Sequence, residues 1–178
     1  MSKIIKIKKT EIQGQPKCDY QFQEDAKIVE YMPVPDGAKK LCVFGSRTIW
    51  DCRVALEING IINQMPDITT IVTTQEPRGV CEVGQRVAQE RNLILELHFL
   101  NFKYARGAFY NRSMEAILAS DYVLLIHDGV LPGTANELQY TKKAKKHFCY
   151  MTLTQSDNRI DKYIGKNIAL KTTNTKVE

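Results

Sequence analysis

The stretch ASDYVLLIHDGVLPGTANELQYTKKAKK, from Ala119 to Lys146, decides the fold of this chain of 178 residues. It contains an apolar run suited to a buried strand (Tyr122–Ile126), a short loop (Gly129–Gly133) and a helix expected to open on Thr134. A strand that leads through a glycine turn into a helix places N–H groups and the positive end of the helix dipole above the strand's carboxyl end. The stretch therefore predicts an anion site in an open α/β sheet.

The same alternation of strand and helix patterns continues on both sides of this stretch. It is typical of an α/β fold with a Rossmann-like open parallel sheet and helices on both faces. Further core strands are predicted at Leu41–Gly45, Ile68–Thr74, Leu93–Leu100 and His147–Leu153. Further helices are predicted after Thr48, from Pro77, and as a short segment around Met114–Leu118. Residues 41–154 are thus expected to form the main domain.

The two ends of the chain do not follow this rhythm. Residues 1–40 read as two strand-like pieces, Lys3–Ile12 and Lys27–Tyr31, separated by glycine and proline. Because an isolated hairpin is marginal in water, we expect an N-terminal β-hairpin extension that pairs with a sheet edge or acts as a dimer arm. Residues 155–178 read as a polar tail with one strand at Asn167–Lys171. Because the N-terminal extension could act as a dimer arm, the protein is expected to be a homo-oligomer, a dimer or larger.

Composition narrows the class of protein. With 43% hydrophobic residues and no apolar run of membrane-spanning length, the chain suits one globular domain. The N-terminus lacks a signal-peptide core, and the five cysteines are odd in number with no CxxC pair, so we expect a cytoplasmic protein with reduced thiols and no membrane partner. The three histidines make no ligand-spaced pair, so neither a metal nor a cofactor is expected.

Four loops follow the carboxyl ends of the predicted strands, and in a doubly wound sheet such loops converge. They are Gly45–Arg47, Thr73–Gly79, Asn101–Ser113 and the turn at Gly133-Thr134. The third loop combines cations with aromatic rings, which suits a nucleobase and its phosphate. We expect the N–H groups of Ser46 and Thr134 to hold an anion. The predicted ligand-binding residues are Gly45, Ser46, Arg47, Thr74, Arg78, Gly79, Tyr104, Arg106, Asn111, Arg112, Asp128, Gly129, Gly133 and Thr134.

Several of these residues also have structural explanations. Gly45 and Ser46 could form a simple strand-to-helix turn, and the third-loop aromatics could form a small satellite core. Glu137 follows Thr134 by three residues, so it could complete a capping box and also face a ligand. Asp128 could bond a ribose hydroxyl. His127 could be either a packing residue or a catalyst.

Four motifs together resemble a known family. GSRTIWD (Gly45–Asp51), KYARGAFYNRSM (Lys103–Met114), ASDYVLLIHDG (Ala119–Gly129) and PGTANEL (Pro132–Leu138) are similar in order and spacing to the SLOG superfamily. They are most similar to its YspA-like branch and more distantly to the Lonely Guy phosphoribohydrolases. The resemblance covers about Leu41 to Leu153.

The resemblance implies a Rossmann-like homodimer that binds nucleotides or nucleotide-derived ligands. In enzymatic members an arginine and a glutamate cleave an N-glycosidic bond, and these roles would fall on Arg112 and Glu137. The chain departs from the family pattern at Gln75 and Glu76, where glycines are usual, and at Tyr110, where an arginine is usual. Side chains at 75 and 76 are expected to crowd a phosphate, and the charge of Glu76 is expected to repel it. The chain also has one glycine, Gly133, where the phosphoribohydrolases have two.

The expected function is therefore binding of a nucleotide or ADP-ribose-type ligand, including a nucleotide signal, by a sensor or sequestering protein. The alternative is an N-glycoside hydrolase or deoxyribosyl transferase that acts on a nucleoside monophosphate. Binding of single-stranded DNA is a third hypothesis. It requires a basic surface continuous with the third loop, and the one lysine cluster, Lys142–Lys146, also reads as a solvated helix end.

Overall fold

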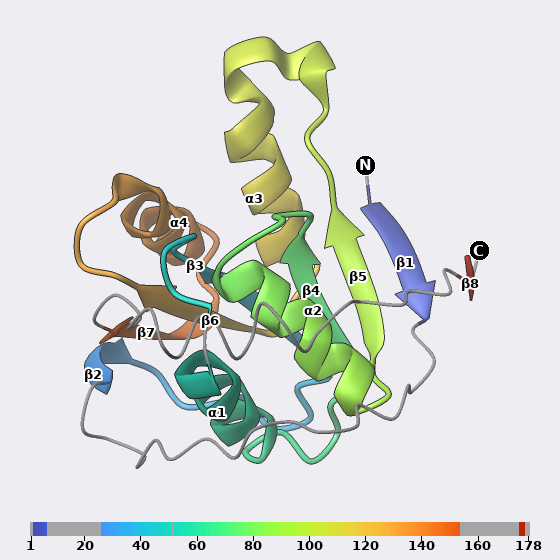
Figure 1. Ribbon diagram of the computed structural model, residues 1–178, viewed down its shortest axis with the longest axis vertical. Coiled ribbons are helices and arrows are strands. Elements are labelled where there is room, and N and C mark those ends of the chain that lie inside the picture. Colours follow the sequence, from blue (N-terminus) through green and yellow to red (C-terminus); the bar gives the residue numbers. More distant parts are fainter. Residues whose placement is uncertain (1, 7–25, 51, 154–174, 177–178) are drawn as a thin grey trace.

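The computed structural model describes residues 2–6, 26–50, 52–153 and 175–176 (Figure 1). These residues form one eight-stranded sheet with the order β2-β7-β6-β3-β4-β5-β1-β8. Its five central strands run parallel to one another. They are β7 (His147–Leu153), β6 (Tyr122–His127), β3 (Lys40–Gly45), β4 (Thr70–Thr74) and β5 (Ile94–His98). The structure confirms the predicted Rossmann-like α/β class.

Helices cover both faces of this sheet, which explains why its central strands are apolar on both sides. On one face, α1 (Cys52–Ile62) and α2 (Val80–Glu90) pack Ile58 and Val83 against β3, β4 and β6. On the other face, α3 (Ala108–Leu118) and α4 (Pro132–Lys143) pack Ile117 and Leu138 against the same strands. Every residue of β6 is buried, as expected for a strand between two helical layers.

All four α-helices in the described residues begin at residues other than those expected. The helix predicted after Thr48 begins at Cys52, and the short helix predicted around Met114–Leu118 begins at Ala108, so the end of the predicted third loop is helical. The helix predicted to open on Thr134 begins at Pro132, because proline supplies a helical φ and has no N–H to leave unpaired at the first position. The helix predicted from Pro77 begins at Val80, because Gly79 has a φ of 84° and so cannot continue a helix from before it. With Pro132 as its first residue, α4 carries Glu137 in its second turn, so the expected capping box does not form.

The N-terminal strands pair with sheet edges, as expected, but not as a hairpin. β1 (Ser2–Lys6) runs antiparallel to β5, and β2 (Ala26–Tyr31) runs antiparallel to β7. The two strands lie on opposite sides of the parallel core and do not pair with each other. A short strand, β8 (Thr175–Lys176), pairs with β1. The strand predicted at Asn167–Lys171 lies outside the described residues, as does the second half of Lys3–Ile12.

Two further expectations concern the membrane and the thiols. None of the helices in the described ranges has the length and apolar character needed to cross a bilayer. Cys42, Cys81 and Cys149 are free and buried, in line with reduced thiols. Cys52, in contrast, is disulfide-bonded, so the expectation of reduced thiols does not hold at this residue.

Candidate functional site

The order of the strands creates a crevice at the carboxyl edge of the sheet. From β3 the chain proceeds to β4 and β5 on one side and later to β6 and β7 on the other. The loops after β3 and β6 therefore diverge, and ligands of open α/β sheets bind at such a switch point. A cavity of about 460 Å³ lies there. It is lined by Gly45, Ser46, Arg47, Thr74, Glu76, Cys81, Phe109, Arg112, Ser113, Leu131, Pro132, Gly133, Thr134, Asn136, Glu137 and Tyr140.

The cavity brings together part of the predicted site. The predicted residues that line it are Gly45, Ser46, Arg47, Thr74, Arg112, Gly133, Thr134 and Glu137. The first and fourth loops therefore do meet at one end of the sheet. The predicted residues outside its lining are Arg78, Gly79, Tyr104, Arg106, Asn111, Asp128 and Gly129.

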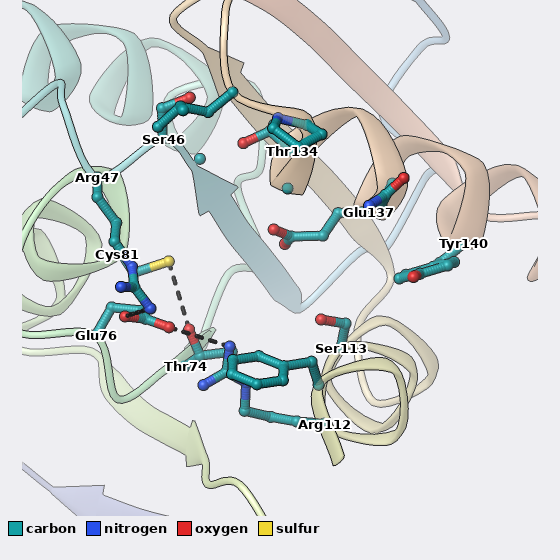
Figure 2. Close-up of a pocket in the computed structure, with 16 residues that line it drawn as sticks. Ser46, Arg47, Thr74, Glu76, Cys81, Arg112, Ser113, Thr134, Glu137 and Tyr140 are labelled. Atoms are coloured by element: carbon teal, nitrogen blue, oxygen red, sulfur yellow. Dashed lines mark hydrogen bonds and ion pairs between the residues drawn. The ribbon is translucent and has the colours of Figure 1, made fainter. Parts of the chain in front are cut away.

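Two arginines and a glutamate form the most highly charged part of the cavity. Arg112 of α3 donates to Glu76 Oε1 at 3.1 Å, and Arg47 contacts Glu76 Oε2 at 2.8 Å (Figure 2). The side chain of Arg112 is only 10% exposed, and its buried Nε has no hydrogen-bond partner among the described residues. Arg112 lines the cavity, so its positive charge lies beside the space that a ligand would fill, and a guanidinium forms strong hydrogen bonds to anionic oxygens.

The N-terminus of α4 faces this charged group across the cavity. Gly133 and Thr134 lie in its first turn, where N–H groups have no partner within the helix. The residue before the helix, Leu131, provides no side-chain hydrogen bond to them. The helix dipole adds partial positive charge at the same place, so this turn can hold an anionic oxygen.

Glu137 points from α4 into the cavity, between the α4 N-terminus and Arg112 (Figure 2). The residue is half-buried in the wall of the cavity. This burial raises the pKa of Glu137 to about 8, against the attraction of Arg112 and with a smaller contribution from the charge of Glu76. Glu137 is therefore mostly protonated at pH 7, as a carboxylic acid able to donate a proton.

This pKa makes the stability of the protein depend on pH. Between about pH 4.5 and pH 8 the folded protein holds a proton on Glu137 that the unfolded chain releases, so stability falls as pH rises through this window. We expect the difference in unfolding free energy between the wild type and Glu137→Gln to change by up to about 1.4 kcal/mol per pH unit, with the variant favoured at high pH. Urea denaturation of both proteins at pH 5, 7 and 9 measures this difference in unfolding free energy. A difference that is constant across these values would contradict the raised pKa.

Ser46 and Asp128 stabilise the loops rather than face a ligand in the expected way. The Ser46 N–H donates to Ile126 O at 3.0 Å, so it does not hold an anion as predicted. The Ser46 hydroxyl lines the cavity and accepts from Asp128 N at 2.9 Å. Asp128 accepts from Thr48 Oγ1 and from the N–H groups of Val130 and Leu131. Both Asp128 oxygens are thus engaged, and the predicted ribose contact is not supported.

The pKa of Asp128 agrees with this structural role. Burial alone would raise it, but the hydrogen bonds from Thr48, Val130 and Leu131 outweigh burial and lower the pKa below its ordinary value. The carboxylate therefore stays charged and holds the loop that leads to α4. Gly129, the next residue, has a φ of 83° that lets the loop turn there.

The third loop contributes through α3 rather than through its outer end. Tyr104 and Arg106 lie in a 3₁₀ turn (η1, Phe102–Gly107) beyond the end of α3 that is farther from the sheet (Figure 1). Both are exposed and lie outside the cavity lining, as does Asn111. The part of this segment that reaches the cavity is one face of α3, with Phe109, Arg112 and Ser113.

The second loop closes the cavity from the side of α2. Arg78 is exposed and stacks over Trp50, with its guanidinium carbon 5.1 Å from the ring centroid. Gly79 packs against Arg47 and Ser46, where an added Cβ would lie 2.5 Å from Arg47 Cα and from Ser46 O. Gly79 is therefore needed for the close approach of the first and second loops, not for direct contact with a ligand.

His127 acts as a packing residue. Its Nε2 lies 2.6 Å from Leu131 O, and because a carbonyl oxygen only accepts, this nitrogen must be the donor. Its Nδ1 lies 2.7 Å from the hydroxyl of Tyr150. Both ring nitrogens are thus used to hold the loop before α4, which favours the structural interpretation over the catalytic one.

Some cavity residues were not predicted, although helical spacing identifies two of them. Phe109 lies three residues before Arg112, and Tyr140 lies three residues after Glu137, so each shares a helix face with a predicted residue. Glu76 was expected to repel a phosphate, not to bind two arginines. The remaining lining residues that were not predicted are Cys81, Ser113, Leu131, Pro132 and Asn136.

Comparisons with family models, with curated proteins and with solved structures found no match for this chain. The resemblance to the SLOG superfamily therefore rests on the four motifs alone and stays a prediction. No group of three or more metal-ligating side chains is present in the part of the chain that the structure describes.

Proposed function

We propose that the protein binds a nucleotide or ADP-ribose-type ligand in this cavity, as a sensor or sequestering protein for a nucleotide signal. The observation that carries the proposal is the position of Arg112. Its side chain, nine-tenths buried, lines the same cavity as the α4 N-terminus. Two sources of positive potential thus line one cavity, an arrangement suited to a phosphate.

The other lining residues support a ligand larger than a phosphate. Phe109 and Tyr140 add aromatic surface, and Tyr140 is held edge-on against Tyr110 at 4.9 Å between ring centroids. Ser113 and Asn136 add polar groups. A volume of about 460 Å³ lies within the range of small-molecule sites. Aromatic and amide groups beside a phosphate-binding turn are suited to a base and a ribose.

Titration calorimetry with ADP-ribose, AMP and adenosine tests this proposal. We expect the two phosphate-bearing ligands to bind and adenosine to bind far more weakly. Arg112→Ala should weaken ADP-ribose binding at least about tenfold, because hydrogen bonds to charged groups are worth about 1.5–3 kcal/mol. Arg106→Ala is the matched control, since Arg106 is exposed and outside the cavity lining; it should change affinity less than about twofold. Absence of binding at millimolar ligand, or equal effects of both variants, would contradict the proposal.

Cleavage of an N-glycosidic bond is a second candidate function, and the protonation of Glu137 favours it. In such a reaction water adds to the anomeric carbon, the bond to the base breaks, and the base takes up a proton. Neutral Glu137 could donate this proton. The resulting carboxylate could then stabilise positive charge that develops on the sugar and accept the proton that the attacking water releases, which restores the neutral acid. Deoxyribosyl transfer would differ only in the acceptor that replaces water.

The proposal also includes self-association and disfavours DNA. β2 is an edge strand with exposed Ile28 and Val29, which supports the homodimer that the family resemblance implies.

In the lysine cluster, Lys142 pairs with Glu30 at 2.8 Å and Lys143 donates to Tyr110 at 3.1 Å. These contacts support a helix end rather than a site for single-stranded DNA.

A further inference from the structure

Glu76 occupies the position in the cavity where an anion would be expected. Two arginines from different elements converge on its carboxylate, Arg47 on one oxygen and Arg112 on the other. The side chains of Glu76 and Arg112 are only 12% and 10% exposed, so this pair is largely desolvated, whereas the side chain of Arg47 is 64% exposed. Arginines bind carboxylate and phosphate by the same geometry. An internal anion thus already neutralises part of the positive charge offered to a ligand.

The charge balance of the cavity follows from these contacts. Arg47 and Arg112 contribute two positive charges, and Glu76 removes one of them. Glu137, the other acid in the lining, is mostly neutral at pH 7 because its pKa is raised to about 8. The charged side chains that line the cavity, Arg47, Arg112 and Glu76, therefore leave a net charge of about +1.

We propose that Glu76 determines the charge of the phosphate that the cavity accepts, and that the cavity takes a singly charged phosphate in preference to a doubly charged terminal monoester. Phosphodiesters and the internal phosphates of a dinucleotide-type linkage carry one negative charge each. A terminal monoester carries nearly two at pH 7.5, because its second pKa is about 6. The additional charge would lie beside the Glu76 carboxylate, and repulsion between like charges is strong in a partly desolvated site.

This inference rests on the proposed function and identifies its ligand more narrowly. It also explains a departure of this chain from the pattern that its motifs resemble. With glycines at positions 75 and 76, both arginines would be available to pair with a ligand, whereas here both form ion pairs with Glu76. The residue thus changes which phosphates are bound without removing the phosphate site.

The test compares AMP with its methyl phosphodiester, two ligands that differ by one charge and one methyl group. Calorimetry at pH 7.5 gives the ratio of their dissociation constants. For the wild type we expect the methyl ester to bind at least as tightly as AMP. Glu76→Gln keeps the shape of the side chain and removes its charge. The affinity for AMP relative to the methyl ester should therefore rise about tenfold. Glu30→Gln, which loses an exposed carboxylate outside the cavity lining, should leave the ratio unchanged.

A second variant keeps the inference testable if Glu76→Gln fails to fold. The side chain of Arg47 is 64% exposed, so Arg47→Gln should be tolerated. Because it removes a positive charge, it should lower the affinity for AMP relative to the methyl ester. A ratio that stays within twofold of the wild type in either folded variant would overturn the role of Glu76 while leaving the proposed function intact. Failure of the wild type and both variants to bind any of the phosphate-bearing ligands would instead overturn the proposed function, and this inference with it.

Discussion

Gly79→Ala is expected to lower the free energy of unfolding by about 3 kcal/mol, whereas Gly129→Ala should lower it by only about 1 kcal/mol. The two glycines have nearly the same positive φ, 84° and 83°, which L residues rarely adopt, and the ψ of −158° at Gly79 lies in a region that essentially only glycine occupies. They differ in their surroundings. A Cβ on Gly79 would lie 2.5 Å from backbone atoms of both Ser46 and Arg47, whereas a Cβ on Gly129 would have no atom within 4 Å.

Because the atoms around Gly79 belong to the backbone, they cannot move aside as a flexible side chain would. Overpacking of this kind costs about 1–3 kcal/mol beyond the strain. Urea denaturation of both variants measures the difference, provided that the slope with denaturant is unchanged. Equal destabilisation by the two substitutions would mean that the first and second loops do not pack as closely as the structure shows.

Glu137→Gln should separate binding from cleavage. If the protein hydrolyses an N-glycosidic bond, we expect this variant to lose at least about 100-fold in the rate of base release, because it has no acidic proton to give. Its affinity for AMP or ADP-ribose should stay within about tenfold of the wild type, since glutamine has the shape and neutrality of protonated glutamate.

The measurement is chromatography of released base after incubation with nucleoside monophosphates and ADP-ribose. Glu30→Gln is a control that makes the same chemical change outside the cavity lining. Release by the wild type and the control, but not by Glu137→Gln, would support the hydrolase. Tight binding without release by any of the proteins would support the sensor or sequestering role. Equal release by the wild type and Glu137→Gln would exclude Glu137 as the proton donor.

The sequence predicted the fold well because its signals are local and periodic. The apolar run Tyr122–Ile126 and the helical spacing around Ile58 each identify an element, and their alternation identifies a parallel sheet. The convergence of Gly45 and Gly133 followed from the same topology. The hairpin at residues 1–40 was wrong in detail, since two strands that are neighbours in sequence can pair with different edges of a sheet.

The sequence could not show how charged side chains are shared within the cavity. Glu76 was expected to repel a phosphate, and its pairing with Arg47 and Arg112 depends on the relative positions of three separate elements. Asp128 was expected to face a ribose, but its carboxylate holds the following loop instead. Arg106 was predicted to bind the ligand because it lies in a loop rich in cations and aromatic rings. In the structure it lies in η1, beyond α3 and outside the cavity lining. Such assignments depend on the direction of side chains, which a pattern of residue types does not define.

The contact between Arg78 and Trp50 makes the protein convenient to study without labels. Trp50 is the only tryptophan in the chain, and it lies in the segment that follows Arg47. Its fluorescence therefore reports on one known place, where the first and second loops meet beside the cavity. A change in emission would locate a rearrangement there directly, and the same signal can follow rapid mixing experiments on a timescale that calorimetry cannot reach.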